Sequence, residues 1–382
     1  MKFGKRTITE KEKLKKFLVA VSVCFGLFIV INVRSYVKNR GAGFPDTYLF
    51  AAFDTSDVVR KNNSTLIYYD EYFREVFRQD IPVSDICNST SPPIICGDKV
   101  YVAPYGDGAW FKPDEVLEID RMTGKQKKYK TGQDFVWSMA VTEDYIFTVS
   151  NSEDAVLART NKKDGSIQEV AYKNGWSSQL NVYGQYLYWF VEDEDGHSWC
   201  IILDIDTMAE IKSVDFTDYG KMPNPGYGEL PNDTYMKDGI LYMPIHYDNE
   251  DEECGHLLMY NTETDELESV DLGHGLPCQI LEFEGKLVVT HTNHFQQPYA
   301  SSFDEQSVSI YDPETGHLEN YETISALDQV IIKDGLLYAL DRKEQSIFIY
   351  DMDSSEEELE LKGCCELKSK GRFYYSGGFF MR

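Results

Sequence analysis

The stretch VSIYDPETGHLE, residues 308–319, decides the fold. Apolar and polar residues alternate at its start, as in a half-buried strand, and a polar turn then leads into a second strand. The side chain of Asp312 is expected to accept hydrogen bonds from the backbone just ahead of it, and Gly316 supplies a positive φ. The stretch therefore predicts a β-hairpin.

This pattern occurs seven times, with its turn Asp or Asn recurring every 39 to 57 residues. The copies are IYYDEYFREV (67–76), LEIDRMTGKQ (117–126), LARTNKKDGSIQ (157–168), IILDIDTMAEI (201–211), LLMYNTETDELE (257–268), VSIYDPETGHLE (308–319) and IFIYDMDSSEEE (347–358). A second hairpin pattern, a turn followed by apolar residues around an aromatic, falls between them. Its copies are GDKVYVA (97–103), EDYIFTV (143–149), GQYLYWF (184–190), DGILYMP (238–244), EGKLVVT (284–290), DGLLYAL (334–340) and KGRFYYS (370–376).

Two hairpins make four strands in about 47 residues, which is the length of one propeller blade. We therefore predict an all-β, seven-bladed β-propeller over residues 47–382. The hairpin with the Asp or Asn turn, which forms the outer strands of a blade, comes first in the chain. The hairpin around the aromatic, which forms the inner strands, comes last, so one blade must be built from both chain ends. The strand TYLFAAF (47–53) is surplus in this scheme. It either replaces the final strand of the closing blade or begins an eighth, partial blade.

The repeats resemble those of seven-bladed propellers with YVTN-type or quinoprotein-like repeats. The turns DRMTGK, NKKDGS, NTETDE and DPETGH, with their preceding aromatic strands, carry the resemblance. It implies the architecture and says little about activity, since propellers serve as enzymes, sensors and docking platforms. Quinone-dependent members carry a regular tryptophan ladder, which the five Trp residues here lack, so no cofactor is expected.

The N-terminus predicts a membrane anchor. Residues 17–33 (FLVAVSVCFGLFIVINV) form an uncharged run, short but sufficient to span a bilayer. The basic residues before it outnumber those after it, which favours a cytoplasmic head (1–16) and an external body beyond a linker (34–46). The alternatives are a cleaved signal peptide, a lipoprotein signal ending at Cys24, and a buried helix of a soluble protein. We expect an uncleaved, single-pass protein in the cell membrane.

Charge excludes one class of partner. The chain carries −27 overall, and because residues 1–40 hold ten basic and two acidic residues, residues 41–382 carry −35. A body this acidic repels phosphate backbones, so nucleic-acid binding is not expected.

Aligning the blades suggests a set of site residues. In the second hairpin pattern, the residues three positions after the central aromatic (Val288 in one copy) are expected to lie at one level of the ring. His291 and Asp341 belong to this level, His246 lies beside it, and His294 lies close by in sequence. These four residues are candidates for a ligand site at the ring mouth, and they would form a metal or acid–base site if their side chains converged. Their spacing matches no dedicated metal motif, so we favour ordinary polar loop residues over a metal site.

Aromatic and acidic loop residues give further candidates. Trp110 and Tyr227, together with Trp137 and Trp176, are expected in loops or at loop–strand junctions, where aromatics suit stacking on sugars or gripping a peptide. The acidic run 192–195 has the ligand type that Ca²⁺ prefers, but it does not fit the EF-hand pattern. We interpret it as a solvated loop.

The leading functional hypothesis is a non-catalytic binding, sensor or interaction module. We expect a monomer whose partner is a peptide, a glycan or a surface protein. The alternative is a lyase or hydrolase with its site at the ring mouth. No nucleophile–base motif is recognisable, which disfavours the enzyme without excluding it, because propeller sites gather residues from distant blades.

Overall fold

The structure is a computed structural model. It describes residues 43–56, 64–86, 91–104, 113–151, 154–219, 233–247, 253–275, 277–291, 306–353, 358–371 and 374–382. Within these ranges no helix is long and apolar enough to cross a membrane. The predicted head and anchor lie outside them, as does most of the predicted linker.

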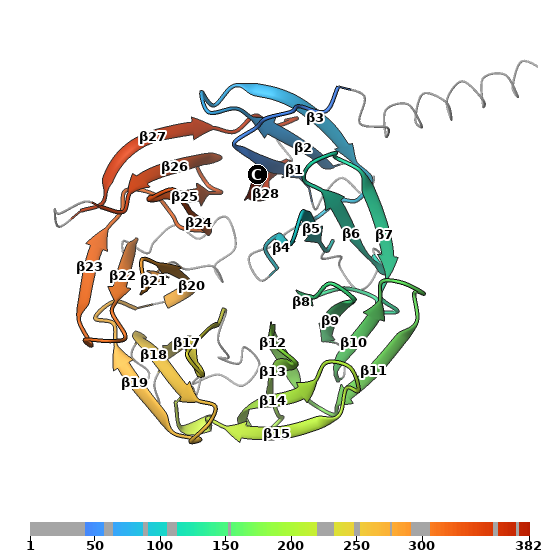
Figure 1. The fold of residues 1–382 in the computed structure, drawn as a ribbon, viewed down its shortest axis with the longest axis vertical. Helices are drawn as coiled ribbons and strands as arrows, with labels where there is room; N and C mark the ends of the chain where they lie inside the picture. The colour runs from blue at the N-terminus through green and yellow to red at the C-terminus, as the bar shows by residue number, and fades with distance from the viewer. Residues whose placement is uncertain are drawn as a thin grey trace, which may run out of the picture.

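Seven four-stranded antiparallel sheets stand around a central axis, which confirms the seven-bladed propeller (Figure 1). We name the strands of each blade A to D from the axis outward and number the blades from the closing one. Blade 1 contains β28 (Tyr375–Met381), β1 (Phe50–Thr55), β2 (Ser64–Tyr69) and β3 (Glu75–Ile81). Blade 2 contains β4 (Ile94–Cys96), β5 (Lys99–Val102), β6 (Glu115–Asp120) and β7 (Gln126–Lys130).

The remaining blades each use four consecutive strands. Blade 3 has β8 (Ser138–Val141), β9 (Tyr145–Asn151), β10 (Ala155–Asn161) and β11 (Ile167–Tyr172), and blade 4 has β12 (Trp176–Tyr183), β13 (Tyr186–Glu192), β14 (Ser198–Asp204) and β15 (Glu210–Asp215). Blade 5 has β16 (Tyr235–Lys237), β17 (Ile240–Tyr247), β18 (Glu253–Asn261) and β19 (Leu267–Asp271). Blade 6 has β20 (Pro277–Phe283), β21 (Lys286–His291), β22 (Ser307–Tyr311) and β23 (Leu318–Glu322). Blade 7 has β24 (Gln329–Lys333), β25 (Leu336–Asp341), β26 (Ser346–Asp351) and β27 (Glu360–Glu366), and a short 3₁₀ helix, η1 (Thr217–Tyr219), follows blade 4.

The closing blade joins both chain ends, as predicted, but not as two hairpins. Its innermost strand β28 comes from the C-terminus, and the other three come from the N-terminus. The predicted inner hairpin at 370–376 is therefore wrong, because its only strand pairs with β1, with Phe50 opposite Met381. The surplus strand 47–53 corresponds to β1, the second strand of this blade, so both placements considered for it are also wrong. Among the described residues of its own segment the last strand has no partner, and it pairs with the free edge of β1.

The core is divided among the blade junctions. The described buried apolar residues form seven clusters, and each cluster combines side chains from two neighbouring blades. Successive side chains of a strand point to opposite faces of its sheet, so Val288 packs toward blade 7 while Leu287 and Val289 pack toward blade 5. No blade buries its own apolar surface alone, and closure at blade 1 completes the last two clusters.

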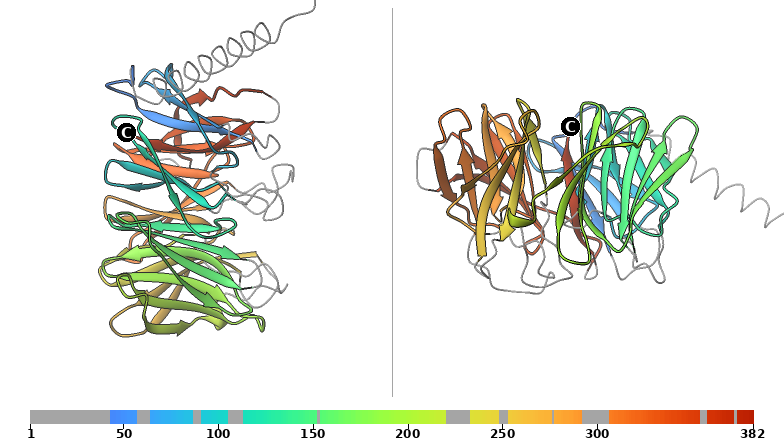
Figure 2. Two further views of the ribbon diagram at one scale, coloured as in Figure 1. Left: turned by 90° about the vertical axis from the view of Figure 1, so that its right-hand side faces the viewer. Right: turned by 90° about the horizontal axis from the view of Figure 1, so that it is seen from below.

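One face of the ring collects the short A–B and C–D turns, and we call it the turn face. At all seven C–D turns the predicted Asp or Asn accepts a backbone N–H two residues ahead. Gly124, Gly165 and Gly316 have φ of 68°, 73° and 71°, as predicted for these turns. The opposite face, where B strands end and C strands begin, is the loop face; the two edge-on views in Figure 2 show the ring as a thick disc between them.

Near the loop face, side chains of the inner strands link neighbouring blades. Gln329 of blade 7 donates to the carbonyl of Phe379 in blade 1 (2.8 Å) and accepts its N–H (2.9 Å). The N–H of Val330 in turn donates to Gln279 of blade 6 (2.7 Å), and that of Ile280 to Asp233 of blade 5 (3.2 Å). Strands β20 and β28 shift register beside these bonds, and β12 does so beside the N–H of Leu180, which donates to Ser138 of blade 3 (3.2 Å). A side chain from the preceding blade thus satisfies an amide next to each irregularity.

Candidate ligand-binding face

The residues predicted to share one level of the ring do lie at one level, but they are buried between blades. Pro104, Ser150, Val191, Ile245, His291 and Asp341 all lie at or near the ends of B strands, close to the loop face. All six are buried. They consequently support the loop face from below.

His291, at the end of β21, is wholly buried. Its Nδ1 lies 2.8 Å from the carbonyl oxygen of Gly275, and its Nε2 lies 2.7 Å from the hydroxyl of Ser309. Ser309 donates onward to Asn320, whose amide donates to the carbonyl of Leu272. Both ring nitrogens are thus engaged in a chain of hydrogen bonds that ties blade 6 to the segment between blades 5 and 6.

Asp341, at the end of β25, holds a loop in place. One carboxylate oxygen accepts the N–H of Glu344 (2.8 Å) and the other accepts the N–H of Ala326 (3.1 Å). Both bonds go to backbone amides, so the described contacts of Asp341 organise the rim. His294, Trp110 and Tyr227 lie outside the described residues, and so does the side chain of His246 in β17. Ligand binding by the predicted set stays a prediction.

Two of the predicted aromatics meet at the loop face. Trp137 directly precedes β8 in blade 3, and Trp176 opens β12 in blade 4, so both stand where inner strands begin. Their ring centroids are 5.0 Å apart with planes at 72°, an edge-to-face contact between neighbouring blades. Asn151 fixes the junction below them, because its side chain accepts the N–H of Ser177 (2.9 Å) and donates to its carbonyl (2.7 Å).

A half-buried glutamate lies on the strand next to Trp176. Glu192 ends β13, directly opposite Trp176 on the neighbouring strand. Burial, and then the like charge of Asp193, raise the pKa of Glu192. Gly175 allows the close approach, since a Cβ there would lie 2.3 Å from the ring of Tyr172 and 3.0 Å from the carbonyl oxygen of Glu192. The sequence predicts a solvated loop over residues 192–195, but Glu192 ends a strand and is half-buried there.

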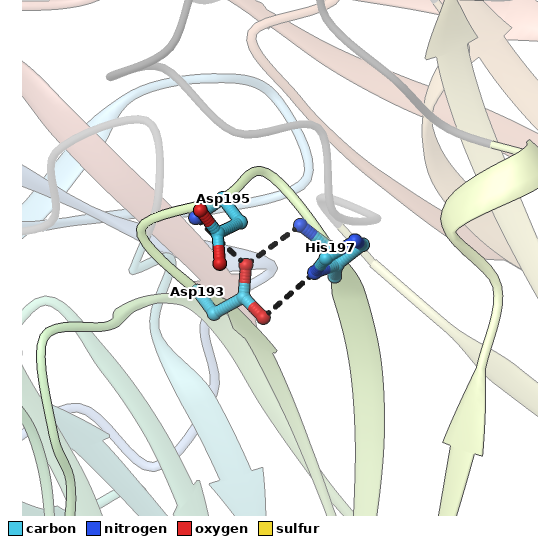
Figure 3. Close-up of side chains that lie close together, drawn as sticks. All are labelled: Asp193, Asp195 and His197. Carbon is cyan, nitrogen blue, oxygen red and sulfur yellow. Dashed lines mark hydrogen bonds and ion pairs between the residues drawn. The ribbon is translucent and has the colours of Figure 1, made fainter.

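The loop after Glu192 brings Asp193, Asp195 and His197 together (Figure 3). Their potential ligand atoms lie within 4.8 Å of one another, the one such group of three among the described residues. Asp193 accepts the N–H of Asp195 (3.0 Å) and of His197 (2.9 Å), and its second oxygen lies 3.0 Å from Nδ1 of His197. Burial opposes ionisation of Asp193, but these bonds outweigh it and lower its pKa. The bonds account for the conformation of the loop without a metal.

Comparison with known proteins supports the fold and goes no further. No protein-family model matches the chain, and no curated relative matches it in sequence. Among solved structures it is similar to a putative 6-phosphogluconolactonase from Bacteroides fragilis, with 14% identity, a TM-score of 0.57, and 88% of this chain and 98% of that chain covered. It is also similar to BamB from Moraxella catarrhalis, with 11% identity, a TM-score of 0.50, and coverage of 86% and 94%.

A third similar structure is a protein from Desulfotomaculum acetoxidans described as functionally unknown, with 9% identity, a TM-score of 0.57, and coverage of 86% and 98%. At such low identity these likenesses show the propeller architecture alone. The YVTN-type or quinoprotein-like character of the repeats stays a resemblance.

Proposed function

We propose that this protein is a membrane-tethered, non-catalytic binding module that contacts its partner through the loop face. The contact of Trp137 with Trp176 beside Glu192 carries the proposal. Large aromatic side chains at a rim supply much of the energy of protein and ligand interfaces. Here two of them come from different blades and are held by a rigid scaffold, which is the usual setting of binding residues.

The chain ends support an orientation in which the loop face points away from the membrane. Phe44 packs against Tyr48 and Phe77 and lies over Gly124, a residue of a turn on the turn face. The N–H of Arg382, at the other end of the chain, donates to the carbonyl of Leu49 (3.1 Å). The described chain therefore begins at the turn face, and the residues between Arg34 and Gly43 reach at most roughly 30 Å.

The orientation rests on the predicted anchor, which a topology experiment tests. Protease added to intact cells is expected to remove the acidic body and leave a small basic stub in the membrane. Complete protection of the body would contradict an external location. The same digestion in permeabilised cells is the control for accessibility.

The binding proposal is tested with the full-length protein in detergent or nanodiscs, probed on peptide and glycan arrays. Trp176→Ala should weaken the binding of a specific ligand about tenfold or more, because a hot-spot aromatic contributes roughly 2 kcal/mol or more to the free energy of binding. Tyr186→Ala is the matched control, since Tyr186 is an exposed aromatic at the turn face of the same blade. Equal losses in both variants, or conversion of the ligand to product, would contradict a non-catalytic module working through the loop face.

A further inference from the structure

Glu192 lacks a counter-charge among the described residues. It is half-buried, yet no described side chain or amide donates a hydrogen bond to it and no described cation pairs with it. Among the described residues, the charge that shifts its pKa is that of Asp193, which has the same sign. Removing a carboxylate from water without a partner raises the free energy of the folded protein. A ligand that brings a positive charge to Glu192 would offset this cost.

The aromatic neighbour of Glu192 favours the same kind of ligand. Trp176 lies directly across the strand pair from Glu192, and directly opposed side chains are within reach of each other. The face of an indole ring attracts ammonium and guanidinium groups more strongly than other aromatic faces do. The protein already uses such contacts on its turn face, where Lys162 lies 4.2 Å from the ring centre of Tyr101. No described lysine or arginine lies over Trp176 in the same way.

From these contacts we propose that Trp176 and Glu192, with Trp137 as the second aromatic wall, form a recognition site for a lysine or arginine side chain of a partner peptide. The inference rests on the proposed function and specifies the chemistry of its partner. A carboxylate beside an indole face offers a cation both an ion pair and a cation–π contact.

The charge of the whole body favours a basic peptide over the other expected partners. Residues 41–382 carry −35, which attracts basic segments and repels anionic glycans. A neutral sugar would stack on the tryptophans but would leave Glu192 without a counter-charge. Only a cationic group satisfies both features of the site.

The probe is a blocked pentapeptide with one central arginine among glycines, titrated against the full-length protein by saturation-transfer NMR. The matched ligand carries citrulline, which has nearly the shape of arginine without its charge. We expect the arginine peptide to bind about tenfold more tightly than the citrulline peptide, and the difference to shrink at high salt. Because this comparison uses the unaltered protein, it does not depend on how a variant folds.

Glu192→Gln should abolish that preference while the melting temperature stays the same or rises, since the change removes an unpaired charge. Glu143→Gln, an exposed carboxylate at the turn face, is the control and should leave the preference intact. Equal binding of the two peptides, or an unchanged preference in Glu192→Gln, would overturn the inference. If an array ligand still depends on Trp176 in that case, the proposed function stands and only the cation chemistry fails.

Discussion

The turns of the turn face and three buried positions near the loop face use their carboxylates in opposite ways. On the turn face, the hydroxyls of Thr207 and Thr315 lower the pKa of Asp204 and Asp312, because they donate hydrogen bonds to the ionised form. On the loop face, burial raises the pKa of Asp54, Glu192 and Asp233. The first group stabilises turns, whereas the second stores unfavourable charge near the rim. Of these three, Glu192 is the one to whose carboxylate no described group donates a hydrogen bond, and ionisable groups with shifted pKa values are typical of functional sites.

The largest loss of stability is expected at blade 1, which is built from both chain ends. Deleting residues 375–382 removes β28 and with it Phe379, Phe380 and Met381, which are all buried. Each such side chain contributes roughly 1.5–3 kcal/mol, and a native protein is stable by only about 5–15 kcal/mol. The truncated chain should be unfolded or aggregated, as judged by circular dichroism and gel filtration. Deletion of Arg382 alone is the control, and a soluble truncated ring with an unchanged melting curve would contradict joint closure.

A smaller effect is expected at the inner hydrogen bonds near the loop face. Gln329→Ala leaves the N–H and carbonyl of Phe379 without the partners that they have in the native protein. A buried polar group left unsatisfied costs about 1–3 kcal/mol, so the free energy of unfolding should fall by roughly 2–5 kcal/mol. Chemical denaturation measures this change. Gln168→Ala, at an exposed position of β11, should cost less than about 0.5 kcal/mol, and a similar cost for both would refute a special role for Gln329.

The opposite pKa shifts of these two groups of carboxylates give a pH-dependent prediction. Burial raises the pKa of Asp233 from 3.8 to about 7, while hydrogen bonds from Ile280 and Thr234 partly oppose the shift. Between these values the folded state keeps a proton that the unfolded state loses. Stability from this group is therefore complete below about pH 4 and falls by at most about 1.4 kcal/mol per pH unit as the pH rises toward 7.

Asp233→Asn should remove that loss, so the variant should gain stability relative to the native protein between pH 5 and pH 8. Asp312→Asn on the turn face is the matched control. The folded-state pKa of Asp312 is lowered, so its contribution is present at neutral pH and is lost only as the pH falls into the acid range. Melting curves of the three proteins at both pH values measure the difference. Parallel pH profiles for Asp233→Asn and the native protein would contradict the assignment.

The contrast between the two groups of contacts also explains which features of the fold could be predicted from the sequence. Each C–D turn is stabilised by contacts between residues close in sequence; the side chains of Asp312 and Asn161, for example, accept the N–H two residues ahead. All seven turns could therefore be predicted. The inner hairpin assigned to 370–376 failed because β28 pairs with β1 at the other end of the chain. No local pattern reports such a pairing.

The candidate site follows the same rule. The sequence predicts Trp137 and Trp176 in loops or at loop–strand junctions, but their contact depends on how two blades pack. The alignment of blades brought His291 to the correct level. It could not reveal that Gly275 and Ser309 engage both of its ring nitrogens, because those contacts come from other strands and loops. Local chemistry is readable in the sequence, and contacts between distant segments are not.

The smallest effect concerns the local chemistry itself. Gly316 has a φ of 71°, and a Cβ added there would meet no atom within 4 Å, so Gly316→Ala measures backbone strain alone. Left-handed backbone costs an L-residue about 1–2 kcal/mol, and Asn tolerates it better than Ala. We expect Gly316→Ala to lower the free energy of unfolding by about 1 kcal/mol and Gly316→Asn by less, with no effect on any loop-face ligand. Met208 and Asp265 adopt φ of 59° and 66° at the equivalent turns of blades 4 and 5, which shows that the ring accepts residues other than glycine at this turn position. If Gly316→Ala weakened ligand binding as much as Trp176→Ala, the two faces would not be independent, and the division of labour between them would fail.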